Sequence, residues 1–258
     1  MRARKRFGQH FLTDPAVLER IGEAVALSPQ DKLLEIGPGH GALTEVLYGQ
    51  CGRFVGVEID RDLITPLKTR FADLEVVNAD VLRLDFREVF AGGGWRVAGN
   101  LPYNISTPLL VKLFGVTDLL HDMHFMVQRE VALRLCASPG NKTWGRLTVL
   151  AQYHCRIEAL FDVPPESFNP SPKVWSQVIR LTPRTDKLPL ADPVCLDTVV
   201  RTAFSQRRKR VSNALKSLTF DWEVIGIAAD ARPDQLSVED FVKLANALAS
   251  RKSGGNDK

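Results

Sequence analysis

Short apolar runs alternate with amphipathic stretches between about residues 31 and 127. The runs have the length of buried strands, and the stretches between them carry apolar residues at helical spacing. This alternation predicts an α/β fold, in which a mostly parallel sheet is connected by crossover helices. The predicted strands are Leu33–Ile36, Phe54–Ile59, Leu74–Val77, Arg96–Gly99 and His124–Val127, and the predicted helices are Ala42–Leu47, Asp62–Arg70 and Pro108–Phe114, with another starting near Arg129.

The pattern changes after Gly145. Two further apolar segments, Arg156–Val163 and Val174–Leu181, are joined by a loop rich in proline. A connection this short cannot make a parallel crossover, so we expect an antiparallel hairpin at the edge of the sheet. Residues 183–193, with three prolines, then read as a linker.

The spacing of apolar residues in the last part of the chain predicts a small all-α domain. We therefore divide the chain into a larger domain over 1–183, which begins with a basic arm over 1–13, and a helical domain over 192–250. The polar, glycine-containing residues 251–258 are expected to be a disordered tail. The helices expected in the second domain are Asp192–Phe204, Gln206–Leu215 and Val238–Leu248.

The positive residues of the chain are clustered. The formal net charge is only +4, yet one basic run lies in the N-terminal arm and a second lies in the helical domain. Such runs are usually solvated faces, but two of them on a nearly balanced chain favour a polyanion as partner. The runs are Arg2, Arg4, Lys5 and Arg6, and Arg207, Arg208, Lys209 and Arg210.

The cysteines and the apolar segments bear on the cellular setting. No two cysteines form a C-x-x-C pair, so neither a zinc site nor a disulfide framework is indicated, and a reducing cytoplasmic setting is expected. The N-terminal arm is not followed by an apolar run, and no run of transmembrane length occurs, so we expect no membrane partner. The cysteines are Cys51, Cys136, Cys155 and Cys195.

A glycine-rich loop, with Gly37 and Gly39, follows the first predicted strand. Glycines at this point let the backbone turn sharply and approach a ligand closely, which indicates a cofactor site. The loop alone also satisfies the dinucleotide fingerprint of nicotinamide and flavin enzymes, and it could be a tight turn without a ligand. The absence of a following Lys-Ser or Lys-Thr excludes a P-loop.

Two acids narrow these alternatives. Glu58 ends the second strand about 20 residues beyond Gly37, where a carboxylate can accept hydrogen bonds from ribose hydroxyls. Asp80 follows the third strand, where it could accept from an adenine amino group, although either acid alone could be a helix cap. With Glu35 before the loop, these acids resemble the pattern of the class I S-adenosylmethionine methyltransferases, whose fold is Rossmann-like.

The tetrapeptide Asn100-Leu101-Pro102-Tyr103 follows the fourth strand, at the edge where ligands of doubly wound folds bind. An exocyclic adenine nitrogen is a poor nucleophile because its lone pair is delocalised into the ring. The Asn100 oxygen and the Leu101 carbonyl could each accept one N–H of that amine, while Pro102 orients the carbonyl and Tyr103 stacks on the base. As an isolated string the tetrapeptide would be a turn, but its position after the loop and the two acids favours a catalytic role.

Taken together, the motifs resemble those of the KsgA-type ribosomal RNA adenine dimethyltransferases, relatives of the Erm methyltransferases. The resemblance covers nearly the whole chain. It implies that Gln9, His10 and Leu12 contact the methionine end of the cofactor and that Phe168 stacks on the target adenine opposite Tyr103. The strings that carry it are residues 7–12, 99–105, 128–131, 168–174 and 204–209.

The resemblance implies S-adenosylmethionine as cofactor and dimethylation of two adjacent adenosines near the 3′ end of small-subunit (16S) ribosomal RNA, within a precursor particle. The second basic run would then contact RNA phosphates. We expect a monomer. Three alternatives remain open: an Erm-type enzyme acting on large-subunit RNA, a protein that serves mainly as a ribosome assembly factor, and a nicotinamide oxidoreductase.

Overall fold

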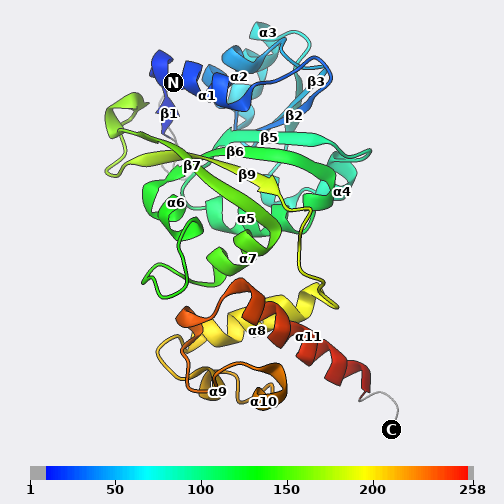
Figure 1. The fold of residues 1–258 in the computed structure, drawn as a ribbon. Coiled ribbons are helices and arrows are strands. Elements are labelled where there is room, and N and C mark those ends of the chain that lie inside the picture. Colours follow the sequence, from blue (N-terminus) through cyan, green and yellow to red (C-terminus); the bar gives the residue numbers. More distant parts are fainter. Residues whose placement is uncertain (1–9, 255–258) are drawn as a thin grey trace. The chain divides into compact units, whose positions relative to one another are not determined.

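The computed structural model describes residues 10–254, whose fold is drawn in Figure 1. The chain divides into two compact units. The first, here named the sheet unit, comprises the chain up to Ala132 together with Arg156–Pro183. The second, the helical unit, comprises Leu133–Cys155 and the chain from Arg184 onward.

The sheet unit is built around seven hydrogen-bonded strands. They are β2 (Lys32–Ile36), β3 (Arg53–Glu58), β4 (Glu75–Asn78), β5 (Trp95–Asn100), β6 (Leu120–Gln128), β7 (Cys155–Val163) and β9 (Ser176–Pro183). The strand order is β4-β3-β2-β5-β6-β9-β7; the first five strands in this order pair in parallel, whereas β9 is antiparallel to β6. The predicted fold class, a mostly parallel sheet with an antiparallel strand toward one edge, is confirmed.

Helices cover both faces of this sheet, as Figure 1 shows. One group lies on one side and consists of α1 (Pro15–Val25), α2 (Ala42–Leu47) and α3 (Arg61–Arg70). The other side carries α4 (Phe86–Val89) and α5 (Ser106–Phe114), and α6 (Arg129–Leu135) follows β6. Helices are thus present after the first, second, fourth and fifth predicted strands, as the sequence predicts. Their apolar spacing gives each helix a face that can be buried.

Helix α1 was not among the predicted elements. Its start signals are nevertheless in the sequence: the Asp14 carboxylate accepts hydrogen bonds from the backbone N–H groups of Ala16 and Val17, and Pro15 occupies the first helical position. Just before α1, β1 (Phe11–Leu12) pairs antiparallel with β8 (Phe168–Asn169). This small second sheet joins the N-terminal segment to the proline-rich loop.

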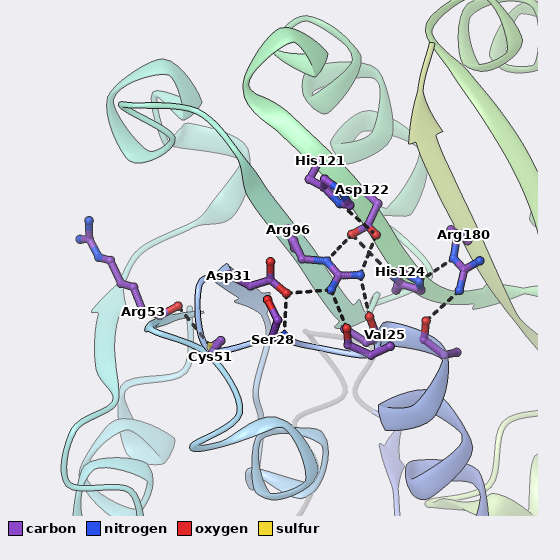
Figure 2. Close-up of polar contacts among 12 residues, drawn as sticks. Val25, Ser28, Asp31, Cys51, Arg53, Arg96, His121, Asp122, His124 and Arg180 are labelled. Carbon is purple, nitrogen blue, oxygen red and sulfur yellow. Dashed lines mark hydrogen bonds and ion pairs between the residues drawn. The ribbon is translucent and has the colours of Figure 1, made fainter. Parts of the chain in front are cut away.

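A buried arginine attaches the C-terminal end of α1 to the sheet (Figure 2). The Arg96 Nε and Nη2 atoms donate to the Asp122 carboxylate at 2.8 and 2.7 Å, and Nη1 donates to Asp31 at 3.0 Å. Arg96 also donates to the carbonyls of Val25 and Ala26, which end the helix, at 2.6 and 3.0 Å. One planar guanidinium thus satisfies two carboxylates and two helix-end carbonyls, which compensates for the desolvation of its charge.

Arg180 makes a second attachment to the same helix end (Figure 2). Its Nη2 donates to the Ala24 carbonyl at 2.8 Å, and its Nε donates to His124 Nε2 at 2.9 Å. The His124 ring is 2% exposed, and burial lowers its pKa to about 4. His124 is therefore neutral at physiological pH and serves as a hydrogen-bond acceptor.

The helical unit contains α7 (Arg146–His154), α8 (Pro193–Ser205), α9 (Val211–Ala214), α10 (Trp222–Ile225) and α11 (Val238–Gly254). α7 contacts α8 and α11, so the division of the chain differs from the predicted continuous domain over 1–183. Most residues of α7 are buried, including Thr148 and Ala151. Because α7 is buried on nearly all sides, it lacks the amphipathic spacing by which a helix is found in a sequence.

Two other expectations in the helical unit differ from the structure. Gln206–Leu215 is not one helix: a turn precedes α9, whose first N–H groups, those of Val211 and Ser212, donate to carbonyls of a later loop instead of continuing a helix. The expected tail over 251–258 is helical up to Gly254, and its last residues lie outside the described part of the chain. Within residues 10–254, no helix has the length and apolar character needed to cross a bilayer.

Candidate active site

Loops that follow four neighbouring strands open into one cavity at the carboxyl edge of the sheet. β2 leads into the glycine loop, β3 ends at Glu58, β4 leads to Asp80, and β5 ends at Asn100. Because these strands are parallel and adjacent, residues far apart in the sequence meet at this edge. The cavity has a volume of about 190 Å³, and the predicted site residues that line it are His10, Gly37, Gly39, Glu58, Asp80, Asn100, Leu101, Pro102 and Tyr103.

Glu58 connects the glycine loop to the end of β3. Its carboxylate accepts hydrogen bonds from the backbone N–H groups of Gly39, at 3.0 Å, and Asp60, at 2.8 Å. The residue is 4% exposed, and burial raises the pKa of the carboxyl above its ordinary value. A carboxylate has about four lone-pair positions, so Glu58 can still accept from groups that enter the cavity.

Asp80 combines a capping role with a place in the cavity wall. Its Oδ1 accepts a hydrogen bond from the Leu82 N–H at 3.0 Å and so caps the short 3₁₀ turn Val81–Arg83. Its Oδ2 lies 3.7 Å from Arg83 Nε, and the side chain is 37% exposed. The cap uses one oxygen and leaves the other at the solvent-accessible wall, where it can accept from a ligand.

The glycine loop requires glycine at both predicted positions. Gly37 and Gly39 have φ angles of +67° and +61°, a region that side chains disfavour. A Cβ atom on Gly39 would also lie only 3.1 Å from the ring of Phe11. The Phe11 ring packs against the loop and lines the cavity, so the N-terminal segment forms part of the site.

The orientation of the Asn100 amide is set by the N-terminal segment. Its Nδ2 donates to the His10 carbonyl at 2.9 Å, which leaves Oδ1 as the acceptor. The next residue, Leu101, donates its N–H to the Met126 carbonyl at 3.0 Å, and its side chain is buried. The Asn100 side chain and the Leu101 backbone are therefore each held by a neighbouring segment.

Tyr103 is held at both its hydroxyl and its ring. The hydroxyl lies 3.0 Å from Ser176 Oγ, and the ring stacks on the His10 imidazole with 5.6 Å between centroids. The His10 Nδ1–H in turn donates to the Pro170 carbonyl at 2.7 Å. This chain of contacts places an aromatic ring of fixed orientation at the cavity beside Asn100.

A larger cavity of about 590 Å³ adjoins the first, and Phe11, Gly37, Gly39 and Asn100 line both. It is also lined by Leu12, a predicted cofactor residue, and by Glu35. Glu35 is 1% exposed, and Thr44 Oγ1 donates to its Oε2 at 2.6 Å. Burial raises the pKa of this carboxyl to about 7.

Phe168 and Gln9 differ from the other predicted residues. The structure does not bring Phe168 to the site: it is 4% exposed, belongs to the hydrophobic core of the sheet unit, and lines neither of the two cavities. Its strand β8 pairs with β1, with Phe168 opposite Leu12, which turns the ring into the core. Gln9 lies outside the described residues.

Sequence reasoning did not assign roles to several residues of the site. Ile59 follows Glu58, is 45% exposed and lines the smaller cavity, and Ser176 positions Tyr103. An apolar residue directly after the acid that ends a predicted strand is a sequence signal that could have pointed to Ile59. No local signal identifies Ser176, because its partner lies 73 residues away in the chain.

The four predicted RNA-binding residues divide into two groups. Arg208, Lys209 and Arg210 are exposed. Arg207 donates to the carbonyls of Asn141 and Lys142, at 3.1 and 2.6 Å, and lies 3.3 Å from the Asp234 carboxylate. Arg207 is therefore largely engaged within the helical unit, which differs from the prediction that all four contact phosphates.

The parallel sheet, the glycine loop and the acids after successive strands define a class I methyltransferase. A solved dimethyladenosine transferase from Plasmodium falciparum is similar to this chain, with a TM-score of 0.81, 27% identity, and coverage of 95% of this chain and 98% of that one. The solved 23S rRNA methyltransferase ErmE shares the fold, with a TM-score of 0.69 at 24% identity over 92% of this chain and 99% of that one.

The sequence comparisons are more specific. The family model described as ribosomal RNA adenine dimethylase matches residues 1–250, so the chain belongs to that family and is a ribosomal RNA methyltransferase. A relative from Pseudomonas fluorescens is 48% identical over 99% of this chain and 97% of its own length. A relative from Pseudomonas aeruginosa is 49% identical over 96% of this chain and 95% of its own length. Both are named ribosomal RNA small subunit methyltransferase A.

Proposed function

We propose that this enzyme uses S-adenosylmethionine to dimethylate the N6 amines of two adjacent adenosines in the 3′-terminal hairpin of small-subunit (16S) ribosomal RNA, during assembly of the subunit in the cytoplasm. The observation that carries the proposal is the common cavity of Glu58, Asp80 and Asn100. Family membership and the names of the relatives at 48% and 49% identity support the choice of RNA.

The residues of the two cavities fit this cofactor. Glu58 has acceptor capacity for ribose hydroxyls, Asp80 for an adenine amino group, and the exposed Ile59 can cover an adenine face. The larger cavity, with Leu12 and Glu35, suits the methionine portion, toward which His10 and Gln9 are also proposed to contribute. When bound, the cofactor supplies an electrophilic methyl group on a sulfonium.

The Asn100 oxygen and the Leu101 carbonyl are proposed to accept the two N–H groups of the target amine. This pairing draws the nitrogen lone pair out of conjugation and aims it at the methyl carbon. With the cofactor bound, this nitrogen would accept the methyl group, with the sulfonium sulfur as leaving group, and would release its extra proton to water. No strong base is needed, because the amine becomes acidic as it is alkylated.

Tyr103 is proposed to stack on the target base after the adenine has left the RNA stack. His10 already covers one face of the Tyr103 ring, so the base is proposed to stack on the other face. Phe168 is packed in the core and does not cover the opposite side of the base. After the first transfer the nitrogen keeps a lone pair and one N–H, so a second methyl group can be added by the same residues.

Two alternatives concern the target and the biological role. An Erm-type target on large-subunit RNA has only a shared fold in its favour, since ErmE is 24% identical to this chain, whereas the relatives named for the small subunit are 48% and 49% identical. A role in subunit assembly is compatible with the enzymatic one, because recognition of an immature particle precedes methyl transfer. We propose that the chain acts as a monomer and that exposed Arg208, Lys209 and Arg210 contribute phosphate contacts.

The test is methyl transfer by the Asn100→Ala variant, with tritiated S-adenosylmethionine and unmethylated small subunits. We expect a loss of about 100-fold or more, the scale of losing one positioning contact, with binding to the particle retained. Asn213→Ala, at an exposed asparagine of α9, is the matched control and should be active. Normal transfer by Asn100→Ala would refute the amine-holding role. In a parallel assay that offers both subunits to the wild type, methylation confined to large subunits would refute the target.

A further inference from the structure

An exposed tryptophan lies at the catalytic edge of the sheet. Trp175 is 48% exposed, and its neighbour Val174 is 44% exposed, whereas Trp95 and Trp144 are each 1% exposed. A large aromatic ring that is exposed to water is stabilised when a partner covers it, and the adjacent exposed Val174 extends this apolar surface.

Trp175 lies close to the residues proposed for catalysis. It immediately precedes β9, and the following residue, Ser176, is the one whose hydroxyl contacts Tyr103. β9 pairs with β6, whose other neighbour is β5, the strand that ends at Asn100. From strand spacing and residue rise, the backbone of Trp175 lies roughly 14 Å from that of Asn100, a distance of a few nucleotides at most.

The backbone of Trp175 is held on both sides. Its carbonyl accepts a hydrogen bond from the Arg129 N–H at 3.0 Å, and Ser176 is paired with Gln128 of β6. The ring is therefore presented from a rigid strand end rather than from a mobile loop. A preorganised ring binds a partner with a smaller loss of conformational entropy.

The charges around Trp175 suit a nucleic acid strand. Lys173, two residues before Trp175, and Arg129, whose backbone N–H bonds the Trp175 carbonyl, are both exposed. Arg129 lies 3.4 Å from the Asp162 carboxylate, which also accepts a hydrogen bond from Gln177, so its guanidinium is oriented while it remains 52% exposed. Glu130 is the exposed acid next to Arg129. With the charges nearly balanced, stacking must supply most of the binding and phosphate contacts the rest.

We propose that Trp175 is a stacking platform for an unpaired base next to the target adenosine in the ribosomal RNA strand. An aromatic ring beside a cationic side chain is the combination that binds single-stranded RNA, because every base offers a π-face. The inference rests on the proposed function and extends it, since it assigns a second base-binding position outside the cavity. The occupant is RNA rather than a protein surface, because the platform continues the proposed target site.

The test uses the full-length enzyme and an unmethylated RNA hairpin that contains the target adenosines in its loop. In a Trp222→Phe background, Trp175 is the main accessible fluorophore, since Trp95 and Trp144 are buried. We expect the RNA to quench its fluorescence. We also expect Trp175→Ala to raise the KM for RNA about 5- to 150-fold, the range expected from losing one stacked base, with kcat at saturating RNA nearly unchanged.

Trp175→Phe is the matched control: it keeps an aromatic face and should retain most of the affinity. The thermal unfolding midpoint should change little in either variant, because about half of the side chain is exposed. An unchanged KM for Trp175→Ala, or no quenching by the hairpin, would overturn the proposed stacking role of Trp175. If the wild type still transferred methyl groups in that case, the proposed function would stand. No methyl transfer by the wild type to any small-subunit RNA would instead refute the proposed function.

Discussion

Replacing Arg96 with methionine tests whether the buried ion cluster holds α1 on the sheet. Methionine has a similar length and apolar volume but no N–H donor. The change removes both hydrogen bonds to Asp122, whose side chain is 8% exposed, and those to the carbonyls of Val25 and Ala26. It leaves a buried carboxylate and the end of a helix without their arginine donors.

The structure sets the expected magnitude. Removing one partner of a buried ion pair costs about 3–5 kcal/mol, because the remaining charge is left desolvated. Asp31 adds less, since its side chain is 24% exposed and water can replace the lost donor. We therefore expect a loss of about 3–5 kcal/mol, a large part of the roughly 5–15 kcal/mol that stabilises an ordinary domain.

The measurement is urea unfolding at pH 7, followed by circular dichroism. Arg53→Met is the matched control, because Arg53 and Glu75 form an ion pair in which both side chains are 54% exposed, and such a surface pair contributes below about 1 kcal/mol. The double variant Arg96→Met/Asp122→Leu removes the unpaired carboxylate and should recover part of the loss.

Two results would refute this reasoning. If Arg96→Met lowered the free energy of unfolding no more than Arg53→Met, the buried cluster would not be what holds α1. If the double variant were destabilised by the sum of its single changes, the cost would not come from an unpaired charge. Faster hydrogen exchange confined to α1 in Arg96→Met would locate the effect at the helix.

Further predictions concern Glu35 and the basic run. Because burial raises the pKa of Glu35 from 4.5 to about 7, the free energy of unfolding of the cofactor-free protein should fall by roughly 3 kcal/mol from this group as pH rises from 4.5 to 7, and then level off. Glu35→Gln should remove that slope in urea titrations across this range; an unchanged slope contradicts the assignment. Arg207→Ala should destabilise the helical unit by about 1–3 kcal/mol, because it removes donors to two carbonyls. Arg208→Ala should leave the free energy of unfolding unchanged and should reduce the slope of log K for RNA binding against log salt concentration by about one. If Arg207→Ala and Arg208→Ala had equal effects on stability and on this slope, the division of the basic run would be wrong.

The amino-acid sequence was sufficient for the central strands and the order of the site residues. Parallel strands buried on both faces are continuous apolar runs, and the residues that follow them must meet at one edge. That rule predicts from the sequence that Gly37, Glu58, Asp80 and Asn100 lie at one edge of the sheet. The glycine positions could be read locally as well, because positive φ angles are a property of single residues.

Only the tertiary structure decided the remaining features, because they depend on which distant segment each residue contacts. α7 lacks an amphipathic pattern because it is buried on nearly all sides, and Phe168 is in the core because β8 pairs with β1. Arg207 looks like a phosphate ligand in sequence, yet it bonds carbonyls more than 60 residues away. Charge and periodicity are local properties of a chain, whereas burial and hydrogen-bond partners are set by segments that meet only in the folded protein.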